Sequence, residues 1–367
     1  MQFRTMTIPH IGTLVLALVA AVDAATYNLA DDYTGNAFLD KFDFMTFDDP
    51  THGFVNYVDK NTALSNGLVS VTGSNFTLGA DSHNVVSGSA RGRDSVRIES
   101  QKTYGTHVSV YNVAHMPKGC GTWPAIWEVG SNWPNGGEVD ILEGVNGQAS
   151  SVSSDSVVTR ISNDCWTGRL GLGRIGSECR YASHQQRMPD VTSSLREMLG
   201  YVLSCSRLSF RSNAGARSLV KNNDCASGTT NTGCGVDFAG DNTFGHAFNV
   251  NDGGFYAMER TNAVVNVWFW ARDDPKTPQD VLNGAQTVDT GNWGTPDALF
   301  PNTNCDIASH FDDHKIVINL TFCGDWAGSE AYQAAGCPST CTDFVTNSPS
   351  EFSWAYFHLM WAKVYEP

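Results

Sequence analysis

The chain has 367 residues, and its 38 Asp and Glu against 23 Lys and Arg give a formal net charge of −15 at pH 7. This balance excludes a nucleic-acid-binding protein, because affinity for phosphate backbones depends on Lys and Arg. With 41% hydrophobic and 17% charged residues, the chain is neither disordered nor a polytopic membrane protein. Aromatic residues reach 11%, a surplus that suits packing against sugar rings.

The first 24 residues have the layout of a secretory signal peptide. Arg4 precedes an apolar run from Ile11 to Val22, and the small residue Ala24 ends the segment, which is too short to span a membrane. We therefore expect a secreted, extracellular protein that is not held at a membrane.

Export would place the ten cysteines in an oxidising compartment, where disulfides are expected. It would also make two Asn-x-Thr sequons, at Asn75 and Asn319, candidate glycosylation sites. Asn319 lies in an apolar run that has the character of a strand.

Two long regions, about 25–150 and 223–367, alternate short apolar stretches with Gly, Asn and Asp turns. This spacing predicts an all-β sandwich or barrel, with no helix longer than a turn or two. The expected strands lie within 67–73, 94–100, 107–115, 124–130, 138–145, 253–260, 263–271, 315–322 and 356–365.

The segment at about 151–220 between these regions has a different composition. It holds nine of the chain's 15 Arg, 14 Ser and no Lys. A loop of this length is unusual inside a compact sandwich. We interpret the segment as an error in the gene model that replaces a sheet strand, with a genuine disordered or disulfide-linked insertion as the alternative.

The densest chemical signal is a run of three carboxylates, Glu138, Asp140 and Glu143. Side chains alternate faces along a strand, so Glu138 and Asp140 share one face, while Glu143 comes one position late. One extra residue in a β-bulge would return Glu143 to the acidic face, and bulges are common beside active sites. The run therefore predicts a bulged strand with three carboxylates on one wall of a cleft.

Two carboxyl groups are the chemical requirement of retaining glycosidases, in which one is the nucleophile and the other the general acid and base. The alternative is a surface strand with solvated acids, which like-charge repulsion on one face disfavours. We therefore predict glycoside hydrolysis.

The residues 138–143 resemble the E-x-D-x-x-E signature of glycoside hydrolase family 16, in the form with the extra bulge residue that laminarinase-like β-glucanases have. Flanking blocks at 121–127, 133–137, 292–296, 302–306 and 319–328 also resemble secreted fungal endo-1,3(4)-β-glucanases. The resemblance covers about 25–150 and 223–366 and implies a β-jelly-roll of two antiparallel sheets, similar to concanavalin A, with the substrate on the concave face. Residues 25–367 would form one catalytic domain.

By this resemblance Glu138 is the nucleophile, Glu143 the acid and base, and Asp140 the residue that assists between them. Trp127, Trp133 and Trp326 are candidates for stacking on glucose units, with a core role as the alternative for each. No cofactor is implied, and no acidic loop identifies the structural calcium that some relatives hold.

Two further patterns are set aside. The glycines at 171, 173 and 176 fit G-x-G-x-x-G without a preceding strand, so we interpret them as chance. His310 and His314 would need a helix to face one metal, and their surroundings predict a polar loop instead.

The sequence therefore predicts a monomeric, secreted, retaining endo-β-glucanase that acts on internal β-1,3 or mixed 1,3/1,4 bonds of a neutral glucan. One alternative is a glucan-binding protein of the same fold with impaired catalysis. Another is a cell-wall transglycosylase, which uses the same two Glu and differs only in whether water or sugar accepts the intermediate.

Overall fold

The computed structural model describes residues 26–88, 90–147, 158–162, 219–222, 233–238, 240, 242–302 and 306–367, and the predicted signal peptide lies outside them. Within these residues β-strands dominate, and the longest helix, α10 (Cys341–Asn347), has seven residues. The prediction of an all-β fold is confirmed.

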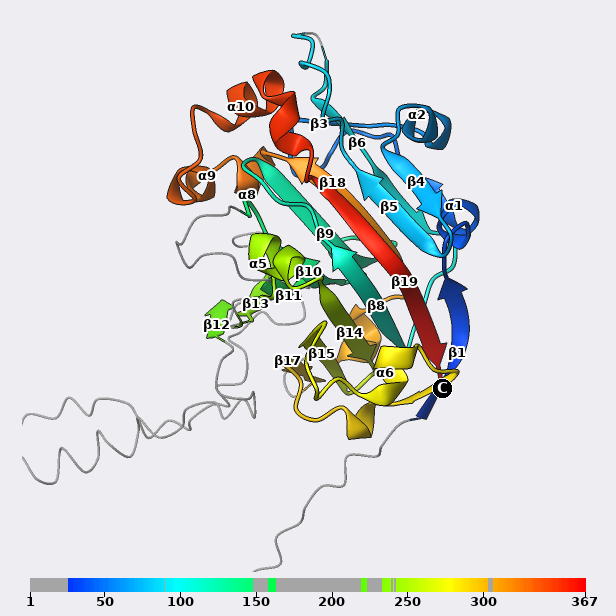
Figure 1. Ribbon diagram of the computed structural model, residues 1–367. Coiled ribbons are helices and arrows are strands. Elements are labelled where there is room, and N and C mark those ends of the chain that lie inside the picture. The colour runs from blue at the N-terminus through cyan, green and yellow to red at the C-terminus, as the bar shows by residue number, and fades with distance from the viewer. Residues whose placement is uncertain are drawn as a thin grey trace, which may run out of the picture.

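One antiparallel sheet has nine strands (Figure 1). Its main path runs β16, β1, β19, β8, β14, β15, β17, and β5 extends β19 while β4 extends β5. The strands are β1 (Thr26–Tyr33), β4 (Val69–Thr72), β5 (Asn75–Gly79), β8 (His107–His115), β14 (Gly254–Arg260), β15 (Val264–Ala271), β16 (Thr287–Asp289), β17 (Ala298–Pro301) and β19 (Tyr356–Glu366).

The second antiparallel sheet has eight strands in the order β12, β13, β11, β10, β9, β18, β7, β2, and β3 pairs with β6 in a separate parallel ribbon. Strands far apart in sequence become neighbours here, since β18 lies between β9 and β7. The strands are β2 (Phe42–Phe44), β3 (Val55–Tyr57), β6 (Arg93–Ser95), β7 (Arg97–Ser100), β9 (Thr122–Gly130), β10 (Glu138–Glu143), β11 (Val158–Ser162), β12 (Leu219–Asn222), β13 (Cys234–Asp237) and β18 (His314–Phe322).

The main core lies between the two sheets, where alternate residues of each strand point inward. Tyr111, Ile126, Ile318 and Leu359 are fully buried there. A second apolar cluster covers the other face of the nine-stranded sheet, where the indole of Trp293 packs edge-on against Trp268 and Trp270. The outer face of the eight-stranded sheet is therefore the one left for a cleft.

Short helices fill the connections between strands. Asp59 caps α2 by accepting hydrogen bonds from two backbone N–H groups, and Thr340 caps α10 in the same way with one. The other helices are α1 (Ala37–Lys41), α2 (Lys60–Ser65), α5 (Gly245–Val250), α6 (Gln279–Asn283), α7 (Ile307–His310), α8 (Gly324–Ala327) and α9 (Glu330–Ala334), with 3-10 turns η3 (Thr290–Asn292) and η5 (Pro349–Phe352).

Helices α8, α9 and α10 form a C-terminal cap over one end of the sandwich (Figure 1). Two disulfides hold the cap: Cys120–Cys337 ties α9's C-terminal flank to the start of β9, and Cys323–Cys341 ties β18 to α10. The expectation of disulfides is met at both positions.

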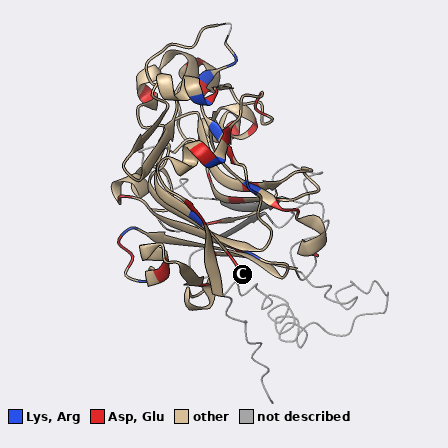
Figure 2. Cartoon of the chain, turned by 90° about the vertical axis from the view of Figure 1, so that its right-hand side faces the viewer, with Lys and Arg blue, Asp and Glu red and all other residues tan. Residues whose placement is uncertain are grey.

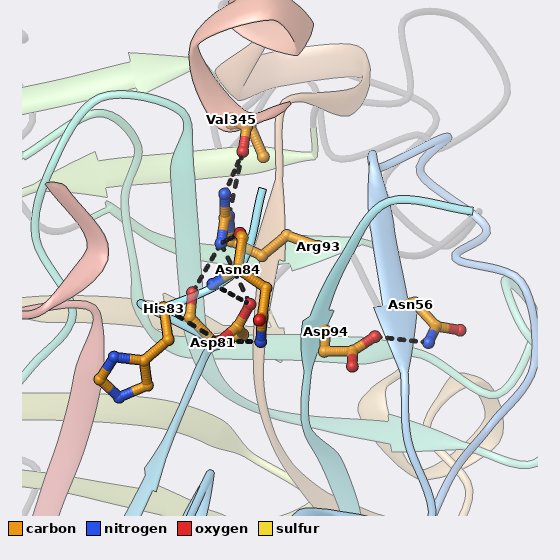
Figure 3. A network of polar contacts seen from close by, with 7 residues as sticks. All are labelled: Asn56, Asp81, His83, Asn84, Arg93, Asp94 and Val345. Atoms are coloured by element: carbon orange, nitrogen blue, oxygen red, sulfur yellow. Dashed lines mark hydrogen bonds and ion pairs between the residues drawn. The ribbon is translucent and has the colours of Figure 1, made fainter. Parts of the chain in front are cut away.

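The cap is also held by the buried guanidinium of Arg93 (Figure 3). Its Nε donates to the carbonyl of Val345 in α10 at 3.0 Å, and its Nη1 donates to the carbonyls of Asp81 and Asn84 at 2.8 and 3.1 Å. The same guanidinium lies 4.6 Å from the Phe352 ring centroid. Arg93 therefore joins the 81–93 connection to the cap.

Two pieces of the Arg- and Ser-rich segment belong to the eight-stranded sheet. β11 pairs with β10 on one side and β13 on the other, and β12 pairs with β13. The expectation that this segment lacks a sheet strand is therefore wrong at Val158–Ser162. The residues from 163 to 218, including the glycine pattern at 171–176, lie outside the described part of the chain.

Among the described residues, no helix has the length and apolar character needed to cross a bilayer. Lys, Arg, Asp and Glu occupy short, scattered stretches of the described ribbon (Figure 2).

Candidate active site

The three carboxylates of β10 lie on one side of a bulged strand. Asp140 is opposite Trp127 of β9, but Leu142 is opposite the very next residue, Ile126, so Ile141 is the extra residue. Ile141 and Leu142 are both fully buried in the core. The prediction of a bulge that returns Glu143 to the acidic face is confirmed.

Each outer carboxylate accepts a hydrogen bond from an indole. Trp133 Nε1 donates to Glu138 Oε2 at 2.8 Å, and Trp123 Nε1 donates to Glu143 Oε1 at 2.8 Å. Glu138 is partly exposed, whereas Asp140 and Glu143 are only 5% and 6% exposed. The two indoles therefore fix the orientation of both carboxyl groups at a site that substrate can reach.

The carboxylates open into a cleft of about 650 Å³ on the outer face of the eight-stranded sheet. Side chains from β7, β9, β10, β18 and the C-terminal cap contribute to it, and Arg97 is the one Lys or Arg among its described lining residues. The lining comprises Asp49, Pro50, Thr51, Arg97, Trp123, Ala125, Trp127, Val129, Trp133, Glu138, Asp140, Glu143, Asn319, Thr321, Asp325 and Trp326. All six residues proposed from sequence line this cleft.

The three candidate tryptophans differ in how much ring they offer. Trp133 is 48% exposed. Trp127 donates from Nε1 to Asn319 Oδ1 at 2.7 Å, and the Arg97 guanidinium lies 4.9 Å from its ring centroid. Trp326 is partly buried and meets Trp123 edge-on, with ring centroids 5.5 Å apart. Trp133 therefore presents the most open aromatic surface.

Polar lining residues that sequence reasoning missed include Asp49, Arg97, Asn319 and Asp325. Asn319 connects β9 to β3, since it accepts from Trp127 and its Nδ2 donates to the Tyr57 hydroxyl at 3.2 Å. Asn319 and Thr321 are two residues apart in an apolar run, so their shared face was a signal that could have been read.

Asp49 is held rigidly beside the cleft. Its Oδ2 accepts from Thr321 Oγ1 at 2.6 Å, from Thr51 Oγ1 at 2.8 Å and from the Gly53 amide at 3.2 Å. A Cβ at Gly53 would lie 2.2 Å from the Asp49 carboxylate, so only glycine fits there. Asp49 is thus held in one orientation in the lining of the cleft.

The two histidines considered as metal ligands do not face one site. His310 ends α7, and His314 begins β18 with its ring buried between the sheets, where Nε2 donates to the Gly136 carbonyl at 2.9 Å. The expected loop is present at residues 311–313, and the two histidines stand at its ends, His310 in α7 and His314 in β18. The described residues contain no group of three or more His, Cys, Asp or Glu arranged to hold a metal ion.

Comparison with known proteins shows which family the chain resembles. The sequence model described as "XgeA-like, catalytic GH16 domain" matches residues 42–160 and 201–365. This match extends into both ends of the Arg- and Ser-rich segment and leaves out only residues 161–200 of it.

Among curated relatives, the chain is 38% identical to a probable glycosidase of Schizosaccharomyces pombe, over 94% of this chain and 70% of that protein. It is 33% identical to a probable endo-1,3(4)-β-glucanase of Aspergillus flavus, over 97% of this chain. The chain spans 47%, about half, of the length of that Aspergillus relative.

Two solved structures share the fold. Laminarinase 16A of Phanerochaete chrysosporium, a GH16 enzyme solved with two 6-O-glucosyl-laminaritriose molecules in donor and acceptor sites, is 44% identical with a TM-score of 0.75, covering 93% of this chain and 100% of that chain. An elongating GH family 16 β-1,3-glucosyltransferase is 33% identical with a TM-score of 0.73, covering 92% and 99%. The jelly-roll architecture is therefore confirmed.

Proposed function

Because the chain belongs to glycoside hydrolase family 16, we propose that it is a β-glucan hydrolase that cleaves internal β-1,3 or mixed 1,3/1,4 bonds with retention of configuration. The observation that carries this proposal is the bulged strand β10, which turns Glu138, Asp140 and Glu143 toward one cleft. The activities of the relatives support the choice of substrate class.

The proposed reaction has two displacements. The Glu138 carboxylate attacks the anomeric carbon, the glycosidic bond breaks, and Glu143 gives its proton to the leaving oxygen. Glu143 then takes a proton from water as the water oxygen replaces Glu138 at the same carbon. The indole N–H of Trp133 stabilises the Glu138 carboxylate as nucleophile and as leaving group.

Asp140 is proposed to assist between the two glutamates. It follows Glu138 by two positions on the same face and is almost fully buried. Its charge influences both neighbours at short range, since a buried carboxylate is poorly screened by water.

Substitution of the nucleophile tests the proposal. Glu138→Gln keeps the shape and the acceptor for Trp133 but removes the attacking charge, so release of reducing ends from laminarin should fall about 10⁴-fold. Glu330→Gln, at an exposed position of α9, is the matched control and should keep full activity. Undiminished activity of the Glu138 variant would refute the assignment.

Four finer points belong to the same proposal. Proton NMR of the first product on laminarin should show the β-anomer if configuration is retained. Product sizes on laminarin, lichenan and barley-type glucan give the linkage preference. Sedimentation of the purified protein tests the expected monomer, and N-terminal sequencing of exported protein tests cleavage after Ala24.

Transfer to a sugar acceptor is the second candidate, and its support is the similarity to the elongating glucosyltransferase. Both reactions share the glycosyl-enzyme intermediate on Glu138. Products longer than the starting laminari-oligosaccharide would favour transfer, whereas only shorter products would favour hydrolysis.

A further inference from the structure

A cluster of ionisable side chains is buried behind the cleft, between the two sheets, and the proposed chemistry does not use it. Its members are His107 of β8, Glu128 of β9, Arg260 of β14 and His314 of β18, all at most 4% exposed. Buried ionisable groups are costly unless each is paired, so the cluster calls for a role.

The charges within the cluster compensate one another. Glu128 Oε1 lies 3.0 Å from His107 Nε2, while His107 Nδ1 lies 2.8 Å from the Gly105 carbonyl. Burial alone would raise the pKa of Glu128, but His107, Arg260 and His314 together hold it below its ordinary value. Glu128 is therefore an anion between the sheets, next to the His107 ring and compensated by the Arg260 guanidinium.

Two members of the cluster reach from it to backbone carbonyls beside the cleft. Arg260 Nη1 donates to the Asp312 carbonyl at 3.0 Å, and the Asp312 amide donates to the Gly136 carbonyl at 3.0 Å. His314 Nε2 donates to the same Gly136 carbonyl at 2.9 Å. Burial, reinforced by Arg260, lowers the pKa of His314 to about 3, so the ring is neutral and carries its proton on Nε2.

Gly136 belongs to the turn at residues 131–137, which we call the Trp133 turn. Within it, the Gly136 amide donates to the Asn132 carbonyl at 2.8 Å, and the Gly137 amide donates to the Pro134 carbonyl at 3.1 Å. Gly137 has φ +78°, and a Cβ there would lie 2.5 Å from the Phe311 ring. The back of the turn is thus fixed by packing and by the cluster, while its front presents Trp133 to Glu138.

We infer that His314 and Arg260 are positioning residues, which hold the Trp133 turn from inside the sandwich and so place the indole N–H on the nucleophile Glu138. The inference rests on the proposed function for its effect on catalysis. The chain of contacts begins at Glu128, passes through Arg260 and His314 to the Gly136 carbonyl, and continues through the Trp133 turn. It ends at the hydrogen bond from Trp133 to Glu138. Neither positioning residue touches substrate.

The test compares two variants at His314. Gln offers an amide N–H in place of Nε2, whereas Leu offers no donor. His314→Leu should lower kcat/KM on laminarin about tenfold, the effect of one lost buried hydrogen bond, and His314→Gln should restore most of it. His358→Leu, on β19 of the other sheet, is the matched control and should leave kcat/KM unchanged.

A double-mutant cycle separates positioning from general weakening. If His314 acts through Trp133, His314→Leu should lose no further activity in a Trp133→Phe protein. Equal losses with and without Trp133 would overturn the inference. If His314→Leu does not fold, Arg260→Lys, which keeps the charge but loses the forked donation, takes its place in the same cycle.

Hydrogen exchange gives a readout that needs no turnover. Amides of residues 131–137 should exchange faster in His314→Leu than in the wild type, and not in His358→Leu. Unchanged exchange in that peptide would overturn the inference even in an active enzyme. If the wild type has no activity on laminarin but exchange at residues 131–137 is faster in His314→Leu, the result would count against the proposed function and not against the inference.

Discussion

At the scale of single residues, indoles and amides fix the groups that would act on a sugar. Trp123 and Trp133 each donate to one outer carboxylate, and Asn319 accepts from Trp127. These hydrogen bonds fix the acceptor groups in the lining of the cleft, so the acceptors are aligned before substrate arrives. The proposed chemistry depends on this alignment as much as on the two glutamates.

The two sequons have opposite surroundings, which leads to a prediction about modification. Asn75 begins β5 at a hairpin turn of the nine-stranded sheet and is partly exposed, whereas Asn319 is 6% exposed and bonded on both sides. In protein exported from a fungal host, we expect a glycan on Asn75 and none on Asn319.

Mass spectrometry before and after glycan removal checks this assignment. Asn75→Gln should remove the glycan mass and leave KM unchanged. Asn319→Ala should keep the mass of the glycan but raise KM about tenfold, because it leaves the partly buried Trp127 N–H without its acceptor. A glycan on Asn319 in active enzyme would contradict the assignment.

At the scale of elements, β10 and the C-terminal cap decide the shape of the cleft. The bulge at Ile141 turns Glu143 to the side of Glu138, and the cap supplies Trp326 and Asp325 to the far wall. The cap is made of helices of at most seven residues, too short to be stable alone. Its stability must come from its attachments.

Removal of the main polar attachment should therefore be costly. Arg93→Met leaves the buried carbonyl of Val345 and the part-buried hydrogen bonds to Asp81 and Asn84 without their donor, so the free energy of unfolding should fall by about 3 kcal/mol (Figure 3). Urea unfolding followed by circular dichroism measures this change.

Arg91→Met is the neighbouring control. Arg91 pairs with Asp48 at the surface, where an ion pair contributes little, so the change should stay below about 1 kcal/mol. Equal losses for the two variants would show that Arg93 is not the attachment that holds the cap.

At the scale of the whole molecule, burial of ionisable groups makes stability depend on pH. Burial lowers the pKa of His314 to about 3 and that of His115 to about 4, both from 6.5. Burial also raises the pKa of Asp297 to about 6. Between pH 4 and 6 unfolding therefore takes up protons at these two histidines and releases one at Asp297, and His358, whose pKa burial also lowers, adds to the uptake.

Stability should consequently fall on acidification from pH 6 to 4, by at least about 1.4 kcal/mol per pH unit, because at these described groups the unfolded chain binds at least one more proton. Asp297→Asn removes the opposing group and should make the slope steeper. Urea midpoints at half-unit pH steps provide the measurement. A flat profile, or a shallower slope in the Asp297 variant, would contradict the pKa shifts.

The sequence by itself predicted many of the strands, including β10 with its three carboxylates. Periodicity of two and the late position of Glu143 are local features, so they predicted the bulge and the shared face of three carboxylates without knowledge of the fold. The exposure of Trp133 also has a local signal, because the polar residues Ser131 and Asn132 precede it. These features are encoded within a few neighbouring residues.

Only the tertiary structure decided which distant residues meet. Asp49, Arg97 and Asn319 come from three separate stretches of the chain, and they reach one cleft because β18 pairs between β7 and β9. The position of β18 also puts His314 behind the turn that carries Trp133. In the same sheet β11 pairs with β10, although the composition of its segment did not indicate a strand. Strand order and register are set by the packing of the whole core, and no local pattern carries that information.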